Sequence, residues 1–521
     1  MARRQLPIGI QSFSRLRERG CYYVDKTPHI RRLLDLGDHY FLSRPRRFGK
    51  SLLVDTLREL FEGNEPLFRG LDIHDRWDWS ARHPVVRLSF DGKHDEPGDV
   101  ARSVTSQLAI IERNAGLDPA ASPSSGPERL RDLLDRLHRA TGQRVAVLVD
   151  EYDKPILDVI DRPEMAMANR DYLRGLYGIV KGSADDVRFT FVTGVSMFSR
   201  VSLFSGLNNL HNISLDPSHA TICGYTDGDL DRVFAPELPG LDRDLIREWY
   251  NGYHWLGDER LYNPFDLLLL FRKREFTPHW FETGSPTFLF RMMMEREVSP
   301  LELEGLAVDA GQLSKFDVDD IDIDALLFQT GYLTIAAKER RGPRTLYTLD
   351  YPNFEVRQSL SDGLLRHVTG RREEAADQGD ELGRLLAAND FEGFAERLRS
   401  FFAGVPYQWQ GGNSPARYEA WYAGMLYACF RTIGLDLRVE DSSGRGRADM
   451  VALHGGQVFV FEFKMADGGE GGKDAAQQAI GQMREKGYAE KYRDRGEPIH
   501  LVGVAFSRED RNLADVKVVP A

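Results

Sequence analysis

Residues 446–464 read GRADMVALHGGQVFVFEFK, two apolar runs separated by the pair Gly455-Gly456. Two such runs joined by a Gly-Gly pair are typical of a β-hairpin. The first run carries Asp449, and the second carries Glu462 and Lys464. Because strand side chains alternate between faces, Glu462 and Lys464 share a face, and the return of the chain brings Asp449 beside them. The sequence therefore predicts two carboxylates and an ammonium group at one spot.

This combination favours phosphodiester hydrolysis with a divalent cation. Carboxylate oxygens suit Mg²⁺ or Mn²⁺, and an ammonium group nearby can position a water molecule or stabilise charge on a phosphate. We expect Asp449 and Glu462 to be metal ligands and, together with Lys464, catalytic residues. The alternative is a solvated ion pair of Glu462 and Lys464 on an exposed strand face. The opposite face of the same strand carries three phenylalanines, Phe459, Phe461 and Phe463.

The hairpin resembles the PD-(D/E)XK nuclease superfamily, in which an Asp precedes a Glu-x-Lys on the neighbouring strand; the resemblance covers about the last hundred residues. Upstream, Glu419 opens a predicted helix and shares its apolar face with Tyr422 and Leu426, which makes Glu419 a further candidate metal ligand. Alternatively, Glu419 only favours a helix N-terminus electrostatically. The resemblance also implies supporting residues beside the metal, on a helix after the hairpin: Gln482, Lys486 and Tyr488.

A second motif lies near the N-terminus, where residues 39–51 read HYFLSRPRRFGKS and a predicted helix follows over 52–61. A strand, a loop ending in Gly-Lys-Ser and a helix are the setting of a phosphate-binding loop. Lys50 would reach the β- and γ-phosphates of ATP, and the Ser51 hydroxyl would bind Mg²⁺. The first glycine of such loops is replaced by Arg44, which costs roughly 1 kcal/mol if that position needs a positive φ. The predicted nucleotide-binding residues of this loop are Arg46, Arg47, Gly49, Lys50, Ser51 and Leu52.

A matching acidic strand follows about a hundred residues later, where residues 145–151 read VAVLVDE. An apolar run that ends in two acids is typical of a buried parallel strand. Asp150 would hold Mg²⁺ through water, and Glu151 would polarise the attacking water. Thr193 ends a further predicted strand and would sense the γ-phosphate, with Arg200 as a supporting charge. The alternative is an α/β domain without nucleotide, whose acidic strand end is an ordinary loop.

The whole chain resembles a bacterial AAA-ATPase-like family whose members commonly carry a C-terminal PD-(D/E)XK domain. The family's usual loop contains Arg-Pro-Arg-Arg, as here, which eases the objection to Arg44. The resemblance implies a P-loop ATPase fold, ATP and Mg²⁺ as ligands and a nuclease-like C-terminal domain. It is carried by LPIGI (6–10), YYVDKT (22–27), RPRRFGKS (44–51), DEYDKP (150–155), TGVS (193–196), WYNGY (249–253), YNP (262–264), TG (283–284) and QTGYLT (329–334).

The length of 521 residues suits two or three domains. We predict an α/β protein: an AAA-like P-loop ATPase domain over 1–225 with a three-layer parallel sheet, a helical lid and winged-helix-like middle over 226–403, and an α/β restriction-endonuclease-like domain over 404–521. Residues 322–349 are the winged-helix candidate, and the Gly- and Pro-containing segment 404–415 is the candidate joint.

Composition excludes several classes of protein. The net charge of −12 argues against a generally basic DNA-coating surface but allows a local basic groove. Three scattered cysteines imply neither a disulfide framework nor a zinc site. No apolar run is long enough to cross a membrane and no signal-type segment begins the chain, so we expect a cytoplasmic protein without a membrane partner.

The sequence therefore predicts an ATPase coupled to a metal-dependent nuclease, acting as an endonuclease or exonuclease on DNA. One alternative is that the nuclease fold only binds nucleic acid. Another is a nucleotide-controlled signalling or DNA-binding switch without nuclease turnover. A homo-oligomer that supplies an arginine in trans is left open.

Overall fold

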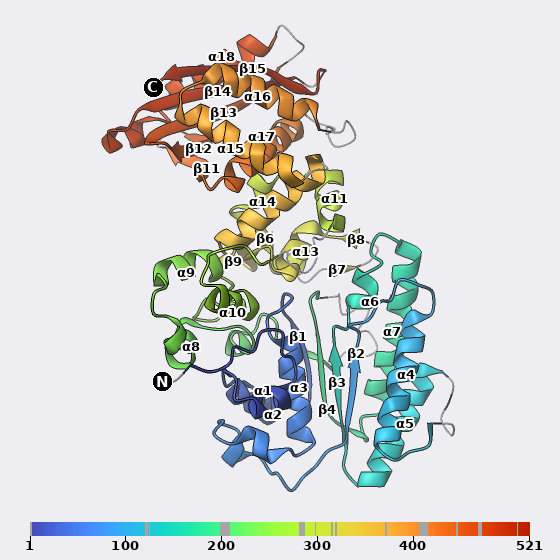
Figure 1. Cartoon of the computed structure of the whole chain (residues 1–521). Coiled ribbons are helices and arrows are strands. Elements are labelled where there is room, and N and C mark those ends of the chain that lie inside the picture. The colour runs from blue at the N-terminus through green and yellow to red at the C-terminus, as the bar shows by residue number, and fades with distance from the viewer. Residues whose placement is uncertain are drawn as a thin grey trace. The chain divides into compact units, whose positions relative to one another are not determined.

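The computed structural model describes residues 3–119, 123, 125–197, 209–280, 287–296, 298–313, 316–317, 320–369, 372–405, 415–443, 446–466, 471–507 and 509–521 (Figure 1). Arg200 and most of the predicted joint at 404–415 lie outside these residues. The chain divides into two compact units. Unit 1 comprises 1–277 and 307–353, and unit 2 comprises 278–306 and 354–521.

Unit 1 is built on a parallel five-stranded sheet in the order β2-β3-β4-β1-β5. Strands β1, β3 and β4 are buried along most of their length, as expected for a parallel sheet covered on both faces, whereas the edge strand β2 alternates buried and half-buried residues. Because β4 lies between β1 and β3, it separates the strand before the Gly-Lys-Ser loop from the acidic strand. The strands are β1 (His39–Ser43), β2 (Val85–Ser89), β3 (Val145–Asp150), β4 (Val187–Gly194) and β5 (His211–Asn212).

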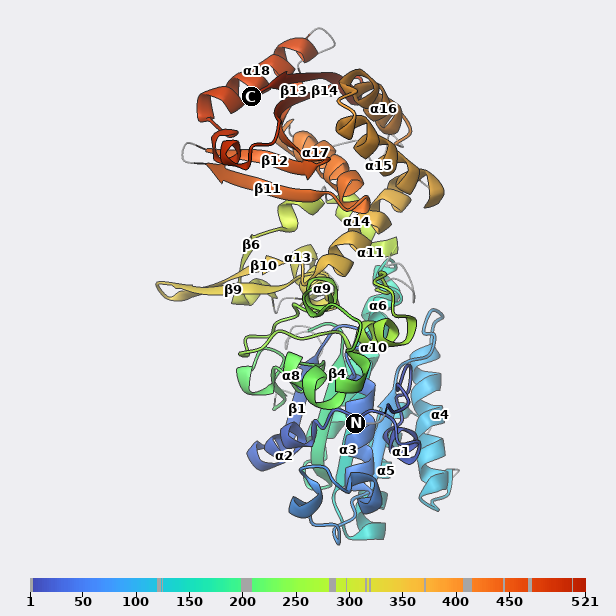
Figure 2. The same ribbon diagram turned by 60° about the vertical axis from the view of Figure 1, so that its left-hand side comes forward.

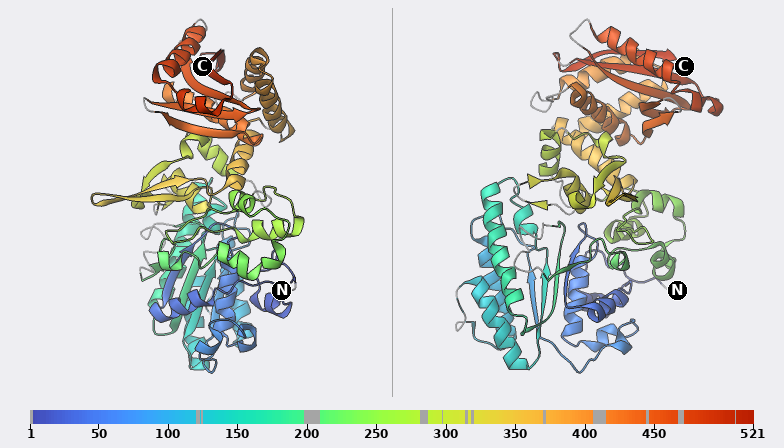
Figure 3. Two further views of the ribbon diagram at one scale, coloured as in Figure 1. Left: turned by 90° about the vertical axis from the view of Figure 1, so that its left-hand side faces the viewer. Right: turned by 180° about the vertical axis from the view of Figure 1, so that it is seen from behind.

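Helices cover the two faces of this sheet and make a three-layer α/β domain (Figures 1 and 3). One layer contains α1 (Phe13–Glu18), α2 (Thr27–Leu36) and α3 (Lys50–Phe61). The other contains α4 (Asp99–Asn114), α5 (Gly126–Thr141), α6 (Lys154–Leu157) and α7 (Pro163–Gly182). The predicted P-loop NTPase fold is confirmed, and its loop and acidic strand end lie at the same edge of the sheet because parallel strands all point one way.

The rest of the described part of unit 1 contains helices, a three-stranded sheet and a two-stranded ribbon. The helices α8 (Asp227–Val233), α9 (Arg243–Tyr250) and α10 (Pro264–Lys273) pack around a core that includes Phe234 and Tyr262. The sheet has the order β6-β10-β9 and accompanies α12 (Ala310–Leu313) and α13 (Ile323–Thr330). Its strands are β6 (Leu306–Asp309), β9 (Thr334–Arg341) and β10 (Arg344–Asp350), and a short ribbon joins β7 (Phe316–Asp317) to β8 (Asp320–Ile321). A helix followed by a two-stranded wing is the arrangement predicted for 322–349.

Unit 2 is built on a mixed sheet in the order β11-β12-β13-β14-β15, antiparallel except for the parallel pair β13–β14. Its strands are β11 (Asp436–Ser443), β12 (Gly446–His454), β13 (Gln457–Ala466), β14 (Ile499–Ser507) and β15 (Asn512–Pro520). Its helices are α11 (Thr287–Glu295), α14 (Phe354–Thr369), α15 (Arg372–Ala387), α16 (Phe391–Ala403), α17 (Pro415–Thr432) and α18 (Gly471–Lys486). The predicted restriction-endonuclease-like α/β fold is confirmed.

The two faces of the second sheet are covered by different helices (Figure 2). Ile480 and Met483 of α18 pack against Val458 and Val460 of β13. The opposite face of β13 carries Phe461, whose ring lies 5.6 Å from that of Phe430 in α17. The face that carries Glu462 and Lys464 is therefore the α18 face, and the phenylalanine face is core.

The two compact units do not coincide with the predicted division at 225 and 403. Helices α14, α15 and α16 group with unit 2, where α14 and α15 pack on α17 and α16 packs on β15. The division into three domains, with its two boundaries after 225 and 403, stays a prediction. In the described part of the chain, no helix is both long and apolar enough to cross a membrane.

Candidate functional site

The loop between β1 and α3 bends at two residues with left-handed backbone, Arg47 (φ 64°) and Gly49 (φ 94°). Arg44 is not one of them, because it continues strand β1 and donates its N–H to the Gly194 carbonyl at 3.2 Å. The conformational cost that the sequence attached to Arg44 is therefore absent. It moves to Arg47, where a non-glycine residue occupies the left-handed region.

The Arg44 side chain is buried beneath the loop and anchors its start by hydrogen bonds. Its guanidinium donates to the backbone carbonyls of Ser43 at 2.8 Å and Ser214 at 2.9 Å, and it lies 4.2 Å from the ring centre of Trp255. Burial lowers the pKa of Arg44 to about 10, so the group stays charged at neutral pH. Arg44 thus has a structural role in the loop, and the backbone carbonyl dipoles stabilise its charge.

Lys50, the first residue of α3, lies within the loop. Its Nζ donates to the carbonyls of Arg44 at 2.9 Å and Pro45 at 2.8 Å. Burial lowers the pKa of this amine, and the negative charges of Asp150 and Glu151 oppose the shift. The ammonium group is therefore positioned close to the acidic strand end before any phosphate arrives.

The acidic strand end has two carboxylates in different environments. Asp150 is 2% exposed, its Oδ1 is buried without a hydrogen-bond partner, and its Oδ2 lies 3.9 Å from Nη2 of Arg87. A buried oxygen left without a donor costs about 1–3 kcal/mol, which a bound cation or its water would relieve. Glu151 follows in left-handed backbone (φ 53°), and burial raises its pKa, which suits a residue that accepts a proton.

Thr193 is fully buried, and its Oγ1 donates to the Leu42 carbonyl at 2.7 Å. This hydroxyl joins β4 to β1 and is not directed at an open phosphate site in this conformation. Of the two loop arginines, Arg46 is exposed, whereas the Arg47 guanidinium carbon lies 3.7 Å from the ring centre of Phe265 in α10. Ser51 and Leu52 are half-buried in the first turn of α3.

The sequence reasoning missed the role of Asp153. Its carboxylate accepts from the N–H groups of Val195 at 3.0 Å and Ser196 at 2.6 Å, and from the Ser196 hydroxyl at 2.5 Å. Burial raises the pKa of Asp153, and the hydrogen bonds oppose this. A Cβ at Gly194 would lie 2.3 Å from Asp153 Oδ1, so only glycine fits there. The only signal was a third acid within the DEYD segment.

In unit 2, the hairpin turns at Gly455 (φ 59°) and Gly456 (φ 71°), the two positive φ angles that a two-residue turn of this type needs. The paired register runs from His454–Gln457 to Met450–Phe461. Beyond it, the Asp449 Oδ2 accepts the N–H of Phe463 at 2.9 Å. This hydrogen bond holds the Asp449 carboxylate beside β13 at Phe463, the residue between Glu462 and Lys464.

Glu462 is more deeply buried than Asp449, and its exposed fraction is 1%. Its Oε1 accepts from Lys464 Nζ at 3.1 Å and from Nε2 of Gln482 in α18, while its Oε2 is buried without a partner. Burial first, and then repulsion by Asp449, raises the pKa of Glu462 to about 7. Glu462 and its neighbouring acid Asp449 share the single ammonium group of Lys464, and Glu462 Oε2 is left without a partner, so the site keeps a net negative charge that a cation would offset.

Glu419 lies in the second turn of α17, which begins at Pro415, so the prediction that Glu419 opens the helix is wrong. Burial and the charge of Asp449 raise its pKa, whereas Lys464 and the backbone N–H of Met465 oppose the rise. Burial alone would lower the pKa of Lys464, but the attraction of Glu462, Glu419 and Asp449 outweighs it and the pKa is raised. The three acids and Lys464 thus share one electrostatic environment.

These residues fit a divalent cation held mainly by two side chains. Among the residues that the structure describes, no group of three or more His, Cys, Asp or Glu side chains is close enough to hold a metal ion by itself. Mg²⁺ is usually bound by one or two carboxylates together with water and substrate phosphate, and Asp449 and Glu462 match that pattern. Glu419 is engaged by the Met465 N–H, so it serves the site through its charge in this conformation.

Of the predicted supporting residues, the structure brings Gln482 onto Glu462, as described above. Lys486 is the last residue of α18. Tyr488 lies beyond the helix, contrary to prediction, because Gly487 takes a left-handed backbone (φ 64°) that ends it. The Tyr488 ring is buried in the core under α18 and contacts the backbone of Gly446.

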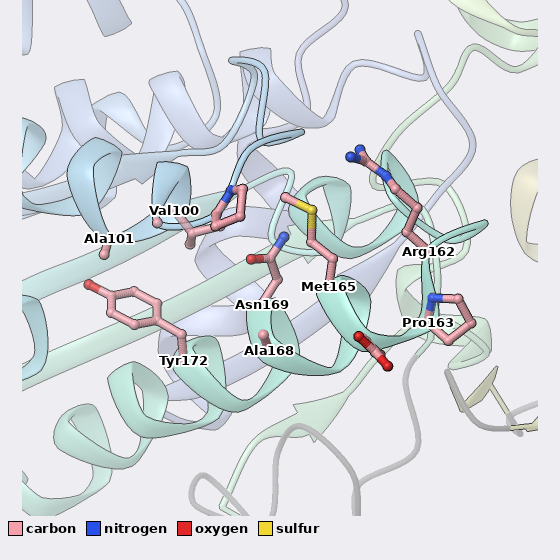
Figure 4. Close-up of a pocket in the computed structure, with 11 residues that line it drawn as sticks. Val100, Ala101, Arg162, Pro163, Met165, Ala168, Asn169 and Tyr172 are labelled. Carbon is pink, nitrogen blue, oxygen red and sulfur yellow. The ribbon is translucent and has the colours of Figure 1, made fainter.

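A separate cavity of about 910 Å³ lies between the first turns of α4 and the first half of α7 (Figure 4). Val100 and Ala101 form one wall, and Met165, Asn169 and Tyr172 face them from α7. None of the predicted site residues lines it. Its mainly apolar walls do not suit phosphate, and the nucleotide and cation arguments do not depend on it.

Comparison with known proteins agrees with the predicted architecture of an ATPase-like and a nuclease-like domain. Residues 7–204 match the family model described as predicted AAA-ATPase, and residues 417–516 match that of the PD-(D/E)XK nuclease superfamily. The chain is 52% identical over 515 residues to the "Uncharacterized protein in vnfD 5'region" of Azotobacter chroococcum mcd 1, covering 98% of each chain. No solved structure matches it. The chain therefore belongs to the predicted AAA-ATPase family and carries a PD-(D/E)XK nuclease superfamily domain at its C-terminal end.

Proposed function

We propose that the protein hydrolyses ATP at the β1–α3 loop and cleaves DNA at the β12–β13 hairpin, each reaction with Mg²⁺ or Mn²⁺. The observation that carries the nuclease half is Glu462: it is buried beside Asp449, it is joined to Lys464 at 3.1 Å, and its second oxygen has no partner. Two neighbouring acids that share one lysine keep a net negative charge, and a buried group of this kind is weak evidence for a purely stabilising role. Binding of a cation and a phosphate would explain why the two acids lie together in this site.

The proposed division of labour follows from these positions. Asp449 and Glu462 would hold the cation, which when bound supplies Lewis-acid activation of water and of the scissile phosphate. Lys464 holds Glu462 in place and presents its remaining N–H donors to a phosphate oxygen. Gln482 donates to Glu462 Oε1, and Oε2, which has no hydrogen-bond partner, would be available to a cation. Glu419 adds negative charge that keeps Lys464 protonated.

The ATPase half rests on the loop geometry. Lys50 is the charge nearest the phosphate position, with Ser51 and Asp150 as the proposed cation side and Glu151 as the proton acceptor. The loop amides of Arg46 to Leu52 would surround the phosphates at the helix N-terminus. Thr193 would reach a phosphate only if its hydrogen bond to Leu42 is released.

A substitution at Glu151 separates binding from turnover. Glu151→Gln should keep ATP affinity within about threefold of wild type and lower hydrolysis by on the order of 10²-fold or more, because the amide keeps the shape but accepts no proton. Nucleotide binding by calorimetry and phosphate release by a coupled assay measure the two effects. Glu164→Gln, an exposed acid in the first turn of α7, is the control. Unchanged hydrolysis would show that Glu151 is not the base.

A stability measurement tests whether the buried carboxylate of Glu462 destabilises the folded state. The folded-state pKa of Glu462 is about 7, against 4.5 in the unfolded chain, so the folded state binds more protons between these values. The contribution of Glu462 to the free energy of unfolding should therefore be highest below pH 4.5. It should fall by about 3 kcal/mol as the pH rises from 4.5 through 7. Glu462→Gln should consequently raise the melting temperature of unit 2 at pH 8 in EDTA, and less so in Mg²⁺.

The matched control for this measurement is Glu485→Gln, an exposed acid on α18, which should leave the melting temperature unchanged. If Glu462→Gln is as stable as wild type at both pH 5 and pH 8, the carboxylate is not strained and the cation argument fails.

The alternative of a nucleotide-controlled switch has one observation in its favour. Lys50 donates to two carbonyls of its own loop, so ATP binding requires the ammonium group to leave them. Such a rearrangement would make turnover slow. Steady-state hydrolysis below about one ATP per minute with unimpaired binding would favour the switch.

A further inference from the structure

The hairpin formed by β9 and β10 ends in a tip whose side chains pack against no hydrophobic core. Residues 337–344 are exposed without exception, whereas Ile335, Tyr347 and Leu349 at its base are buried. Figure 2 shows the hairpin extending as a narrow two-stranded arm from the rest of unit 1. We refer to residues 337–344 as the finger. Because its base is packed and its tip is not, the finger is a fixed projection and not a covered strand.

The finger has a charge opposite to that of the chain. Its sequence AKERRGPR contains four cations and one anion, for a net charge of +3 in a protein of net charge −12. Within the finger, Arg340 Nε donates to the Gly342 carbonyl at 3.4 Å. Arg341 pairs with Glu339 at 3.0 Å, and both side chains of this ion pair are more than half exposed. An exposed pair of this kind contributes little to stability. The cations therefore need an explanation other than folding.

Strand register distributes these cations over both faces of the ribbon. Arg344 is paired with Arg341, and Thr345 is paired with Arg340. Directly opposed residues point to the same face, and neighbours along a strand point to opposite faces. Lys338 and Arg340 thus share one face, while Arg341 and Arg344 share the other. A ribbon with cations on both faces fits between two rows of negative charge.

The dimensions agree with one such place, the major groove of duplex DNA. The four steps from Ala337 to Arg341 extend roughly 13 Å at about 3.3 Å per residue. The major groove is about 12 Å wide and about 8.5 Å deep and admits a two-stranded ribbon, with a phosphate backbone on either side. The deep, narrow major groove of duplex RNA does not admit side chains in this way.

We propose that the finger enters the major groove of duplex DNA and contacts the phosphates on both sides through Lys338, Arg340, Arg341 and Arg344. The inference deepens the proposed function and rests on DNA being the substrate. It adds a second DNA-binding surface, in unit 1, besides the hairpin site of unit 2. The finger recognises duplex charge and groove shape, because the proposal assigns its four cations to phosphates, and its tip, Gly342-Pro343, adds no side chain that can read base edges.

The test is the salt dependence of DNA binding by the full-length protein in EDTA, where no strand is cut. Fluorescence anisotropy with a labelled duplex of about 25 base pairs gives the slope of log K against log [salt], and each phosphate contact contributes about 0.9 to it. The variant with Gln at Lys338, Arg340, Arg341 and Arg344 should bind at least about tenfold more weakly at low salt. Its slope should be shallower by two to about 3.6.

The matched control replaces four other exposed cations of unit 1 by Gln, again one lysine and three arginines: Lys181, Arg113, Arg131 and Arg144. Its slope should stay within half a unit of wild type. On duplex RNA of the same sequence, the finger variant and wild type should have equal slopes.

Equal slopes of the finger variant and wild type on DNA would overturn the proposal, and would direct the finger to an acidic protein surface instead. An equal loss of slope on RNA would overturn groove entry. In both cases wild-type DNA binding is intact, so the proposed function survives. If the wild type binds no duplex at all, the finger proposal and the DNA half of the proposed function fail together.

Discussion

Asp449→Ala is expected to reduce metal-dependent DNA cleavage by on the order of 10³-fold, the scale of losing one charge-stabilising group in a catalytic site. The Asp449 carboxylate is fixed by the Phe463 N–H at 2.9 Å, next to the buried Glu462, so its removal leaves the cation a single carboxylate ligand. Cleavage of an end-labelled duplex in Mg²⁺, followed on denaturing gels, measures the effect. Asp494→Ala, an exposed acid of the same unit, is the control and should cut at the wild-type rate.

Lys464→Ala distinguishes cation binding from catalysis at the same site. Its ammonium group contacts Glu462 Oε1, and the other oxygen of that carboxylate stays available to a cation. We therefore expect this variant to bind Mn²⁺ nearly as well as wild type by calorimetry and to cleave more slowly by about 10²-fold or more. An Mn²⁺ affinity that falls as far as that of Asp449→Ala would contradict the separate roles.

Lys50→Ala is expected to weaken ATP binding by about 1.5–3 kcal/mol, which is roughly 10- to 150-fold in affinity, and to stop hydrolysis. Lys50 is buried at the start of α3, and its ammonium group lies in the loop at 2.8 and 2.9 Å from two carbonyls. No other lysine lies in this loop. Binding of a fluorescent ATP analogue, with a thermal melt to verify folding, measures the change.

The control is Lys93→Ala, which removes the same group from an exposed position and should bind ATP as wild type does. Lys50→Met keeps the packing of the side-chain stem without the charge. If Lys50→Met binds ATP with unchanged affinity, the β1–α3 loop is not the phosphate site.

Local sequence patterns were sufficient for both motifs. The alternation of Phe459, Phe461 and Phe463 with Glu462 and Lys464 determined which face of β13 is core, and Gly455-Gly456 determined the turn. The apolar run before Asp150 and the Gly-Lys-Ser segment likewise predicted a parallel sheet with both at one edge. These features depend on neighbours within a few residues, which sequence spacing records.

Features that depend on distant segments were not predictable. Arg44 is held by carbonyls of Ser43 and Ser214, and the second lies far along the chain. Asp153 acquires its role from the N–H groups of Val195 and Ser196. Sequence spacing does not reveal such partners. It attached a conditional conformational cost to Arg44, whereas the non-glycine residue with left-handed backbone in this loop is Arg47.

Helix ends were the other source of error. The resemblance to the nuclease superfamily implies Tyr488 on the helix after the hairpin, but Gly487 ends α18 in a left-handed conformation. The start of α17 at Pro415 places Glu419 in its second turn. Helix ends are decided by one or two residues, and an apolar period does not record them.

The most direct test of the account is a cleavage assay of the full-length wild type beside Glu462→Gln. Both proteins, purified identically, are incubated with labelled single- and double-stranded DNA in Mg²⁺, in Mn²⁺ and in EDTA, with and without ATP. The account predicts metal-dependent strand cleavage by the wild type, none in EDTA, and loss of cleavage in Glu462→Gln. Absence of cleavage by the wild type under every condition, or equal cleavage by Glu462→Gln, would contradict it.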